Sequence, residues 1–211
     1  IWRTIDDLEN SKLIFMPAVE TISDAAAAKL ERFVRNGGKL IAVQCSGKAD
    51  ENGNPRTRGA LDKLLGIDTS KAVCKSGSFK LVPASPVLAG LKNFSLREMG
   101  SGAKLKAAQL LAGTAEAPVI TVRKHGRGAA WYVGCDIFQI YSRMTTMRQF
   151  KSFAGQVETL QKFMLSLQPE RHVAVTTLKG KNAIGVRTVA RVLGKAKLIP
   201  AIDYQDPNME A

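Results

Sequence analysis

Residues 12–43 read KLIFMPAVETISDAAAAKLERFVRNGGKLIAV, and this stretch decides the fold class. An apolar run over residues 12–16 ends at Pro17, which predicts a short strand. Ser23 is a preferred N-cap residue, and Asp24 follows in the first turn, where the helix dipole favours a negative charge. A helix is therefore predicted to begin there, with one apolar stripe formed by Ala26, Leu30, Phe33 and Val34.

The end of this helix and the strand after it complete one supersecondary unit. Asn36-Gly37-Gly38 supplies a glycine stop, and Leu40–Val43 is apolar and β-compatible. A strand, a helix, a short glycine turn and a second strand form a βαβ unit, which implies parallel strands and a right-handed crossover. We therefore predict an α/β fold with an open, mostly parallel sheet and helices on both faces.

The middle of the chain has weaker signals. Residues 50–55 are dense in turn formers and predict an exposed loop, and a short helix is expected at Gly59–Leu65. Pro83, Pro86 and several glycines break the apolar runs between residues 78 and 111, so irregular structure with short strands is expected. Two later segments are clearer: a β-hairpin over Pro118–Val133 and an amphipathic helix over Phe153–Leu167.

The C-terminal segment predicts a second strand-helix-strand unit. His172–Thr176 and Leu198–Ile202 are rich in β-formers, and between them Asn182 can cap a helix whose apolar stripe is Val186, Val189, Ala190 and Leu193. An isolated unit of this size has too little core to remain folded. We therefore expect residues 169–211 to complete the sheet of a core formed by residues 1–168, the alternative being that they begin a second domain.

Several of these segments together resemble a known family. They are the strand and Pro17, the helix opened by Ser23-Asp24, the run Phe33–Ala42, the loop Asp50–Gly53, the segment Ser85–Leu91 and the hairpin Ala117–Asp136. Over about residues 5–167 they resemble class I glutamine amidotransferase-like domains. The variant that they resemble most is the β-galactosidase trimerisation domain of glycoside hydrolases.

The resemblance implies a flavodoxin-like or amidotransferase-like sheet with a β-hairpin at one edge. In that family a strand, a helix and a strand precede the segment that corresponds to residues 6–9, and here they do not stand in front of it. The C-terminal unit has the order of the missing one. The chain is therefore interpreted as a circular permutation of the domain, or as a cut across tandem or swapped copies.

The resemblance places Cys45 at the position of the amidotransferase nucleophile. Such a cysteine needs small neighbours, backbone N–H groups for the oxyanion and a histidine that activates the thiol. Val43-Gln44-Cys45-Ser46-Gly47 keeps only the trailing glycine, and Pro17-Ala18-Val19 replaces the Pro-Gly-Gly of the oxyanion strand. Where the histidine is expected the chain reads Val133-Gly134-Cys135-Asp136. Cys45 is therefore only a weak catalytic candidate.

Other candidate site residues follow from the sheet edge and from charge. Open α/β sheets bind ligands beyond the carboxyl ends of their strands, which makes Glu20, Ser46 and Asp136 ligand-binding candidates. The formal charge is +13, and the tail carries basic residues without acidic ones between 171 and 197. We interpret this charge as a solvated face, with a polyanion site as the alternative, at Arg187, Arg191, Lys195 and Lys197.

Three hypotheses for function remain after this reading. The first is a non-catalytic α/β module that supports assembly or substrate-cleft shape in a carbohydrate-active enzyme, with further copies or other enzyme domains as partners and carbohydrate as a possible ligand. The second is a cysteine-dependent amidase or hydrolase at Cys45, and the third is a basic nucleic-acid-binding module, which lacks aromatic stacking platforms. Three cysteines without metal spacing predict neither a metal nor a cofactor. The chain is expected to be soluble, in an undetermined compartment, without a membrane span.

Overall fold

The computed structural model describes residues 11–91, 95–114, 117–135, 162–164, 186–188, 191–193, 196–198 and 201–203. The chain forms two compact units, residues 1–137 and 138–211. The residues around the division predicted at 168/169 lie outside the described ones, so that division stays a prediction.

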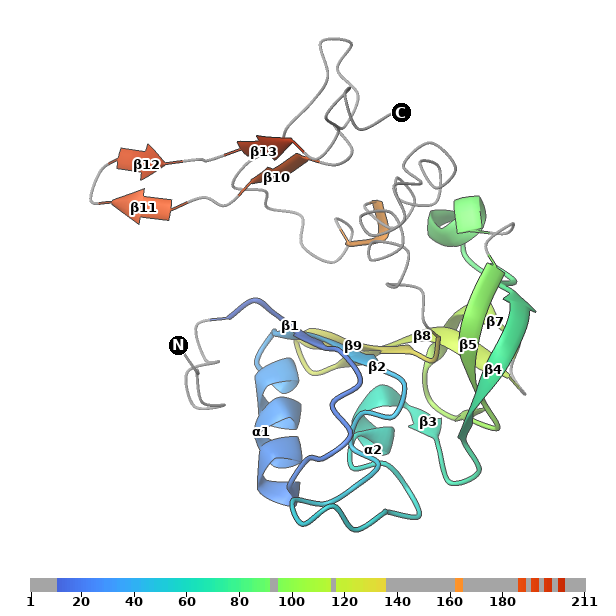
Figure 1. Cartoon of the computed structure of the whole chain (residues 1–211). Helices are drawn as coiled ribbons and strands as arrows, with labels where there is room; N and C mark the ends of the chain where they lie inside the picture. The colour runs from blue at the N-terminus through green and yellow to red at the C-terminus, as the bar shows by residue number, and fades with distance from the viewer. Residues whose placement is uncertain are drawn as a thin grey trace. The chain divides into compact units, whose positions relative to one another are not determined.

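The first unit is a mixed α/β structure built on an open five-stranded sheet with the strand order β1-β2-β9-β8-β7 (Figure 1). Two shorter antiparallel pairs, β3 with β6 and β4 with β5, complete its strands. The elements, in chain order, are β1 (Leu13–Met16), α1 (Asp24–Arg35), β2 (Lys39–Val43), α2 (Asp62–Leu65), β3 (Ile67–Asp68), β4 (Val73–Lys80), the 3₁₀ helix η2 (Pro86–Leu91), β5 (Ser95–Ser101), β6 (Lys104–Leu105), β7 (Gln109–Gly113), β8 (Pro118–His125) and β9 (Gly128–Val133).

The predicted βαβ unit is confirmed. Strands β1 and β2 pair in parallel, and Ser23 Oγ accepts a hydrogen bond of 3.1 Å from the backbone N–H of Ala26. At the other end of α1 the N–H of Gly38 donates to Phe33 O and that of Gly37 to Val34 O, both at 3.0 Å. This pair of bonds is a Schellman motif, which requires the positive φ of 113° that Gly37 adopts.

The expectation of a mostly parallel sheet holds in part, since β8 alone of the five strands runs opposite to the others, but the expectation that the hairpin forms the sheet edge is wrong. The predicted hairpin exists as β8 and β9, but β9 lies in the centre of the sheet, parallel to β2, and β7 pairs antiparallel outside β8. The two strands of a hairpin are antiparallel to each other. Because β9 is parallel to β2, β8 must therefore run antiparallel to both. The sheet is therefore mixed, and its edges within the described residues are β1 and β7.

Both helices α1 and α2 cover the same face of this sheet (Figure 1). Their buried apolar side chains form one core cluster with side chains from alternate positions of β2 and β9, namely Leu30, Val34, Leu61, Leu64, Leu65, Leu40, Ala42, Ala130 and Tyr132. The predicted helices on both faces are thus not found among the described residues. Of the helix predicted over Phe153–Leu167, only residues 162–164 are described, and they are helical.

The helix predicted between Asn182 and Leu193 is wrong. The described tail residues form four short strands, β10 (Val186–Thr188), β11 (Arg191–Leu193), β12 (Ala196–Leu198) and β13 (Ala201–Asp203). Strand β10 pairs antiparallel with β13, and β11 with β12, so these strands do not join the first sheet as expected. β-Branched residues favour strands, and Val186 and Thr188 in β10 and Val192 in β11 are of this type. The interpretation of the chain as a circular permutation depended on that helix and is not retained. The strand predicted at His172–Thr176 lies outside the described residues.

Candidate functional site

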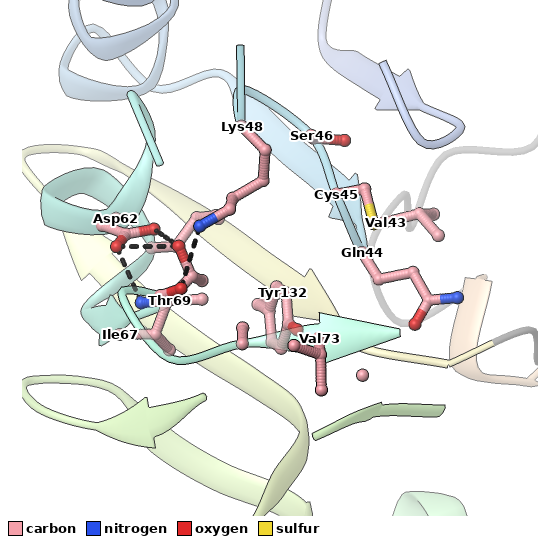
Figure 2. A pocket seen from close by; sticks show the side chains of 13 residues that line it. Val43, Gln44, Cys45, Ser46, Lys48, Asp62, Ile67, Thr69, Val73 and Tyr132 are labelled. Atoms are coloured by element: carbon pink, nitrogen blue, oxygen red, sulfur yellow. Dashed lines mark hydrogen bonds between the residues drawn. The ribbon is translucent and has the colours of Figure 1, made fainter. Parts of the chain in front are cut away.

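A small cavity of about 50 Å³ lies at the carboxyl ends of β2 and β9. Gln44, Cys45 and Ser46 line it directly after β2, and Tyr132 lines it from β9 (Figure 2). Parallel strands end at the same edge of a sheet, so this is the edge at which open α/β sheets bind ligands. A cavity of this size holds a few water molecules.

Cys45 forms an elbow at the end of β2. Its φ of +67° is unusual for a residue other than glycine, and its side chain is exposed. The amides that follow it are already used, because Ser46 N donates to Val43 O at 3.2 Å, Gly47 N to Val19 O at 2.9 Å and Lys48 N to Cys45 O at 3.3 Å. An oxyanion hole needs N–H donors aimed at the reacting atoms. The elbow has the shape of a nucleophile site, but the three amides that follow Cys45 are bonded to carbonyls.

The histidine in the described part of the chain lies at the opposite end of the sheet from Cys45. His125 precedes β9 while Cys45 follows β2, and the two strands run parallel in register from Lys39 opposite Ala129 to Val43 opposite Val133. The His125 Nε2 atom lies 3.3 Å from Glu31 Oε1 on α1. His125 therefore cannot act as a base for the Cys45 thiol, and His172 lies outside the described residues.

Of the sheet-edge candidates, the structure places only Ser46 in the cavity wall. Ser46 is 8% exposed, and its Oγ has no hydrogen-bond partner among the described residues. The Glu20 side chain is exposed, outside the cavity lining. Asp136 lies outside the described residues.

The described strands bring two of the four polyanion candidates into one strand pair. Arg191 lies on β11 opposite Leu198 and Lys197 on β12 opposite Val192, while Arg187 lies on β10, which pairs with β13. Lys195 lies outside the described residues. A polyanion site at these residues stays an untested prediction.

Sequence reasoning missed a buried polar cluster beside the cavity. The Asp62 carboxylate accepts hydrogen bonds from the Thr69 N–H and from Thr69 Oγ1, both at 2.8 Å, and Lys48 Nζ donates to the Thr69 carbonyl at 2.9 Å (Figure 2). Burial raises the pKa of the Asp62 carboxyl, although the Thr69 hydrogen bonds act in the opposite direction. Lys48 and Thr69 lie in loops and Asp62 opens α2, positions where polar residues are ordinarily solvated, so no pattern in the sequence indicated this cluster.

Gln44 adds a second unsatisfied polar group to the cavity wall. Its side chain is 7% exposed, and its Oε1 has no hydrogen-bond partner among the described residues. A Cβ atom at Gly100 would lie 3.1 Å from the Tyr132 hydroxyl and 3.3 Å from Gln44 Oε1. The missing side chain at Gly100 therefore leaves room where these polar atoms converge.

Among the described residues, neither a metal-binding group nor a membrane-spanning helix is found. Within them, no group of three or more His, Cys, Asp or Glu side chains is placed to hold a metal ion. None of the helices described is both long and apolar enough to cross a membrane.

Comparison with known proteins decides the family. The model of the β-galactosidase trimerisation domain matches residues 1–150, which is more than half of the chain. The chain belongs to this family. Trimerisation-domain relatives include β-galactosidase BgaA of Planococcus sp. (strain 'SOS Orange'), 28% identical over 144 residues that cover 61% of this chain and 20% of the relative. The exo-β-D-glucosaminidase of Pyrococcus horikoshii is 25% identical over 159 residues, which cover 75% of this chain and 19% of that enzyme.

Solved structures share the fold of this trimerisation domain. The β-galactosidase from Rahnella sp. R3 matches with a TM-score of 0.71 at 19% identity, covering 94% of this chain and 28% of that one. The β-galactosidase from Bacillus circulans sp. alkalophilus matches with a TM-score of 0.68 at 20% identity, covering 92% and 27%. The chain thus spans about a fifth of the curated relatives and about a quarter of the solved ones.

Cys45 is expected not to show the enhanced reactivity of an activated catalytic thiol. Because His125 lies at the opposite end of the sheet and the amides of Ser46, Gly47 and Lys48 are bonded to carbonyls, its rate with iodoacetamide at pH 6 should lie within roughly tenfold of that of a short unstructured cysteine peptide. Mass spectrometry of tryptic peptides measures the rate at each cysteine. Buried Cys135 is the internal control and should react far more slowly. Complete labelling of Cys45 at pH 6 long before the peptide reacts would contradict the prediction.

Proposed function

We propose that this domain is a non-catalytic module that supports the assembly or the substrate-cleft shape of a larger carbohydrate-active enzyme. The observation that carries the proposal is the family match over residues 1–150. The occupied amides at Ser46, Gly47 and Lys48 support it, because they remove the electrostatic stabilisation that acyl transfer requires. The glycosidase carboxylates would then lie in another domain of the enzyme.

The elbow is best explained as the remnant of an amidotransferase-like site. Two residues in the described chain other than glycine have positive φ, Cys45 at +67° and Ala18 at +49°. Both stand where the amidotransferase pattern has its nucleophile and its oxyanion strand. A cysteine-dependent hydrolase has this elbow in its favour, and against it the bonded amides of Ser46, Gly47 and Lys48 and the distant place of His125. The alkylation rate of Cys45 distinguishes the two.

The partners that fit this role are further copies of the chain and other domains of the same enzyme. The relatives are named as β-galactosidases and an exo-β-D-glucosaminidase, and the shared segment covers only a fifth of each. In this role the domain contacts carbohydrate through a cleft that it helps to shape. A stable assembly ordinarily requires an interface of at least about 1,000 Å².

The isolated chain is expected to assemble in solution. Sedimentation equilibrium at about 100 µM should give an average mass above 22.8 kDa that approaches three times this value, because mass action favours the assembly at high concentration. Dilution to about 1 µM should lower the average mass and is the control for reversible association rather than aggregation. A mass that stays at that of the monomer at both concentrations contradicts an assembly role for this segment.

A further inference from the structure

A second cavity in the first unit is open and basic; it shares Asp62 and Ile67 with the wall of the first cavity, but Cys45 does not line it. It has a volume of about 500 Å³, within the range of ordinary small-molecule sites. Four cationic side chains line it, together with the carboxylates of Asp62 and Asp68; the cations are Arg58, Lys63, Lys106 and Arg123. We call this cavity the basic groove.

The four cations reach the groove from four different parts of the fold. Arg58 lies in the loop before α2, Lys63 on α2, Lys106 after β6 and Arg123 on β8. Charges scattered over a surface would not need to converge from four elements on one cavity. A groove lined mainly by one sign of charge focuses the electrostatic field and attracts ions of the opposite sign.

The carboxylates of the groove neutralise these cations only in part, because Asp68 forms long salt bridges with Arg58 and Lys106. Asp68 Oδ2 lies 3.8 Å from Arg58 and 4.0 Å from Lys106, which is too far for a hydrogen bond, while Asp68 Oδ1 accepts from Ser70 N at 2.9 Å. The Asp62 carboxylate is bonded to Thr69 instead. Four positive charges therefore stand against two carboxylates, and the two salt bridges of Asp68 are too long to be hydrogen-bonded, so the groove keeps an excess of positive charge.

Arg123 is held in place and keeps donors available. Its guanidinium donates a hydrogen bond to the backbone carbonyl of Lys63 in α2. Its aliphatic part lies over Gly66, where a Cβ atom would come within 2.8 Å of Arg123 Cδ. A guanidinium has five N–H donors, so one bond to a carbonyl leaves several for a ligand.

We propose that the basic groove binds a phosphate or sulfate group, either as the free ion or attached to a small sugar. Arginine forks match the oxygen geometry of such dianions and form charge-assisted hydrogen bonds with them, and the two lysines add point charges. The groove volume exceeds the size of one ion, so it leaves room for an organic part such as a pyranose ring.

The test compares ligands and charge-matched variants of the whole chain by isothermal titration calorimetry at constant low ionic strength. The ligands are inorganic phosphate, sulfate, glucose 6-phosphate and, as the uncharged control, glucose. The test variant is R58Q/K106Q, whose side chains are 73% and 58% exposed, so the fold should survive. The matched control is K75Q/K124Q, which removes the same charge from exposed positions outside the groove.

Saturable binding of an anion is expected, and R58Q/K106Q should weaken it at least about tenfold while K75Q/K124Q changes it less than about twofold. Tighter binding of glucose 6-phosphate than of phosphate, with no binding of glucose, assigns the groove to a sugar-borne group. Equal binding assigns it to the free ion. Absence of saturable binding, or equal weakening in both variants, would overturn the proposal, since the second result reflects net charge alone. The melting temperatures of both variants confirm that they are folded.

Discussion

Replacing Gly128 with alanine is expected to lower the free energy of unfolding by at least about 3 kcal/mol. Gly128 begins β9, where that strand meets the end of α1. A Cβ atom there would lie 2.1 Å from the Gly38 carbonyl oxygen and 2.2 Å from that of Val34, both of them backbone atoms. Relief requires α1 to move away from the sheet, which opens the packing around Val34 and Leu40, both fully buried. Urea denaturation followed by circular dichroism measures the loss.

Gly53→Ala is the matched control for the Gly128 variant. A Cβ at Gly53 would meet nothing within 4 Å, although its φ of +82° is unfavourable for alanine. This substitution should therefore cost only about 1 to 2 kcal/mol, the ordinary penalty of the left-handed conformation. If Gly128→Ala costs no more than Gly53→Ala, the close approach of β9 to α1 is not what holds this corner together.

Local signals in the sequence predicted the βαβ unit and the hairpin well. The Ser23 cap, the stripe of α1 and the glycine stop all act within a few residues, and each forms as expected. The place of β9 between β2 and β8 was not predicted, because strand order depends on contacts between residues far apart in the chain. No turn or cap signal encodes that order.

The tail shows how an apolar pattern can fit two structures. Val186, Val189, Ala190 and Leu193 recur at helical spacing, yet the same segment contains the short strands β10 and β11. Strands of three residues are too short for period-two alternation to stand out from a helical stripe. The β-branched residues were the better signal, since they favour strands over helices.

The candidate site was located only in part from the sequence. The resemblance placed Cys45 correctly at the end of β2, but it gave no indication that Ser46 and Gln44 would be buried with unsatisfied oxygens. It also gave no indication of the hydrogen bonds between Asp62, the first residue of α2, and Thr69, which directly follows β3. Such contacts depend on how the loops fold over α2, and no regular spacing of residues in the sequence predicts them.

Asp62→Ala is expected to destabilise the chain by about 2 to 4 kcal/mol, because it leaves the buried Thr69 N–H without its acceptor. Asp62 is 7% exposed, and both of its carboxylate oxygens accept hydrogen bonds from Thr69. Asp62→Asn keeps one acceptor oxygen and the shape of the side chain, so its loss should be smaller, about 1 to 2 kcal/mol. Equilibrium denaturation at pH 7 measures both variants.

The pH dependence of Asp62→Asn gives a sharper test of the same site. Burial raises the pKa of the Asp62 carboxyl above 3.8, so the folded chain binds this proton more tightly than the unfolded chain does. The contribution of Asp62 to stability is then full below pH 3.8 and is lost as the pH rises through the folded pKa. Hydrogen bonds, chiefly from Asn54 to Asp50 and from Ser70 to Asp68, lower the pKa of those two carboxyls, whose contributions are lost as the pH falls.

Asp62→Asn removes the stabilisation at low pH that comes from the raised pKa of Asp62, and it keeps the loss of stability at low pH that comes from Asp50 and Asp68. The variant should therefore lose stability more steeply than the parent chain as the pH is lowered toward 3.8, and the difference in free energy of unfolding between the two should grow on acidification. Urea titrations at a series of pH values from neutral to about 3 measure that difference. A difference that stays constant or shrinks would mean that the Thr69 hydrogen bonds outweigh burial and that the Asp62 carboxylate is held in its ionised form.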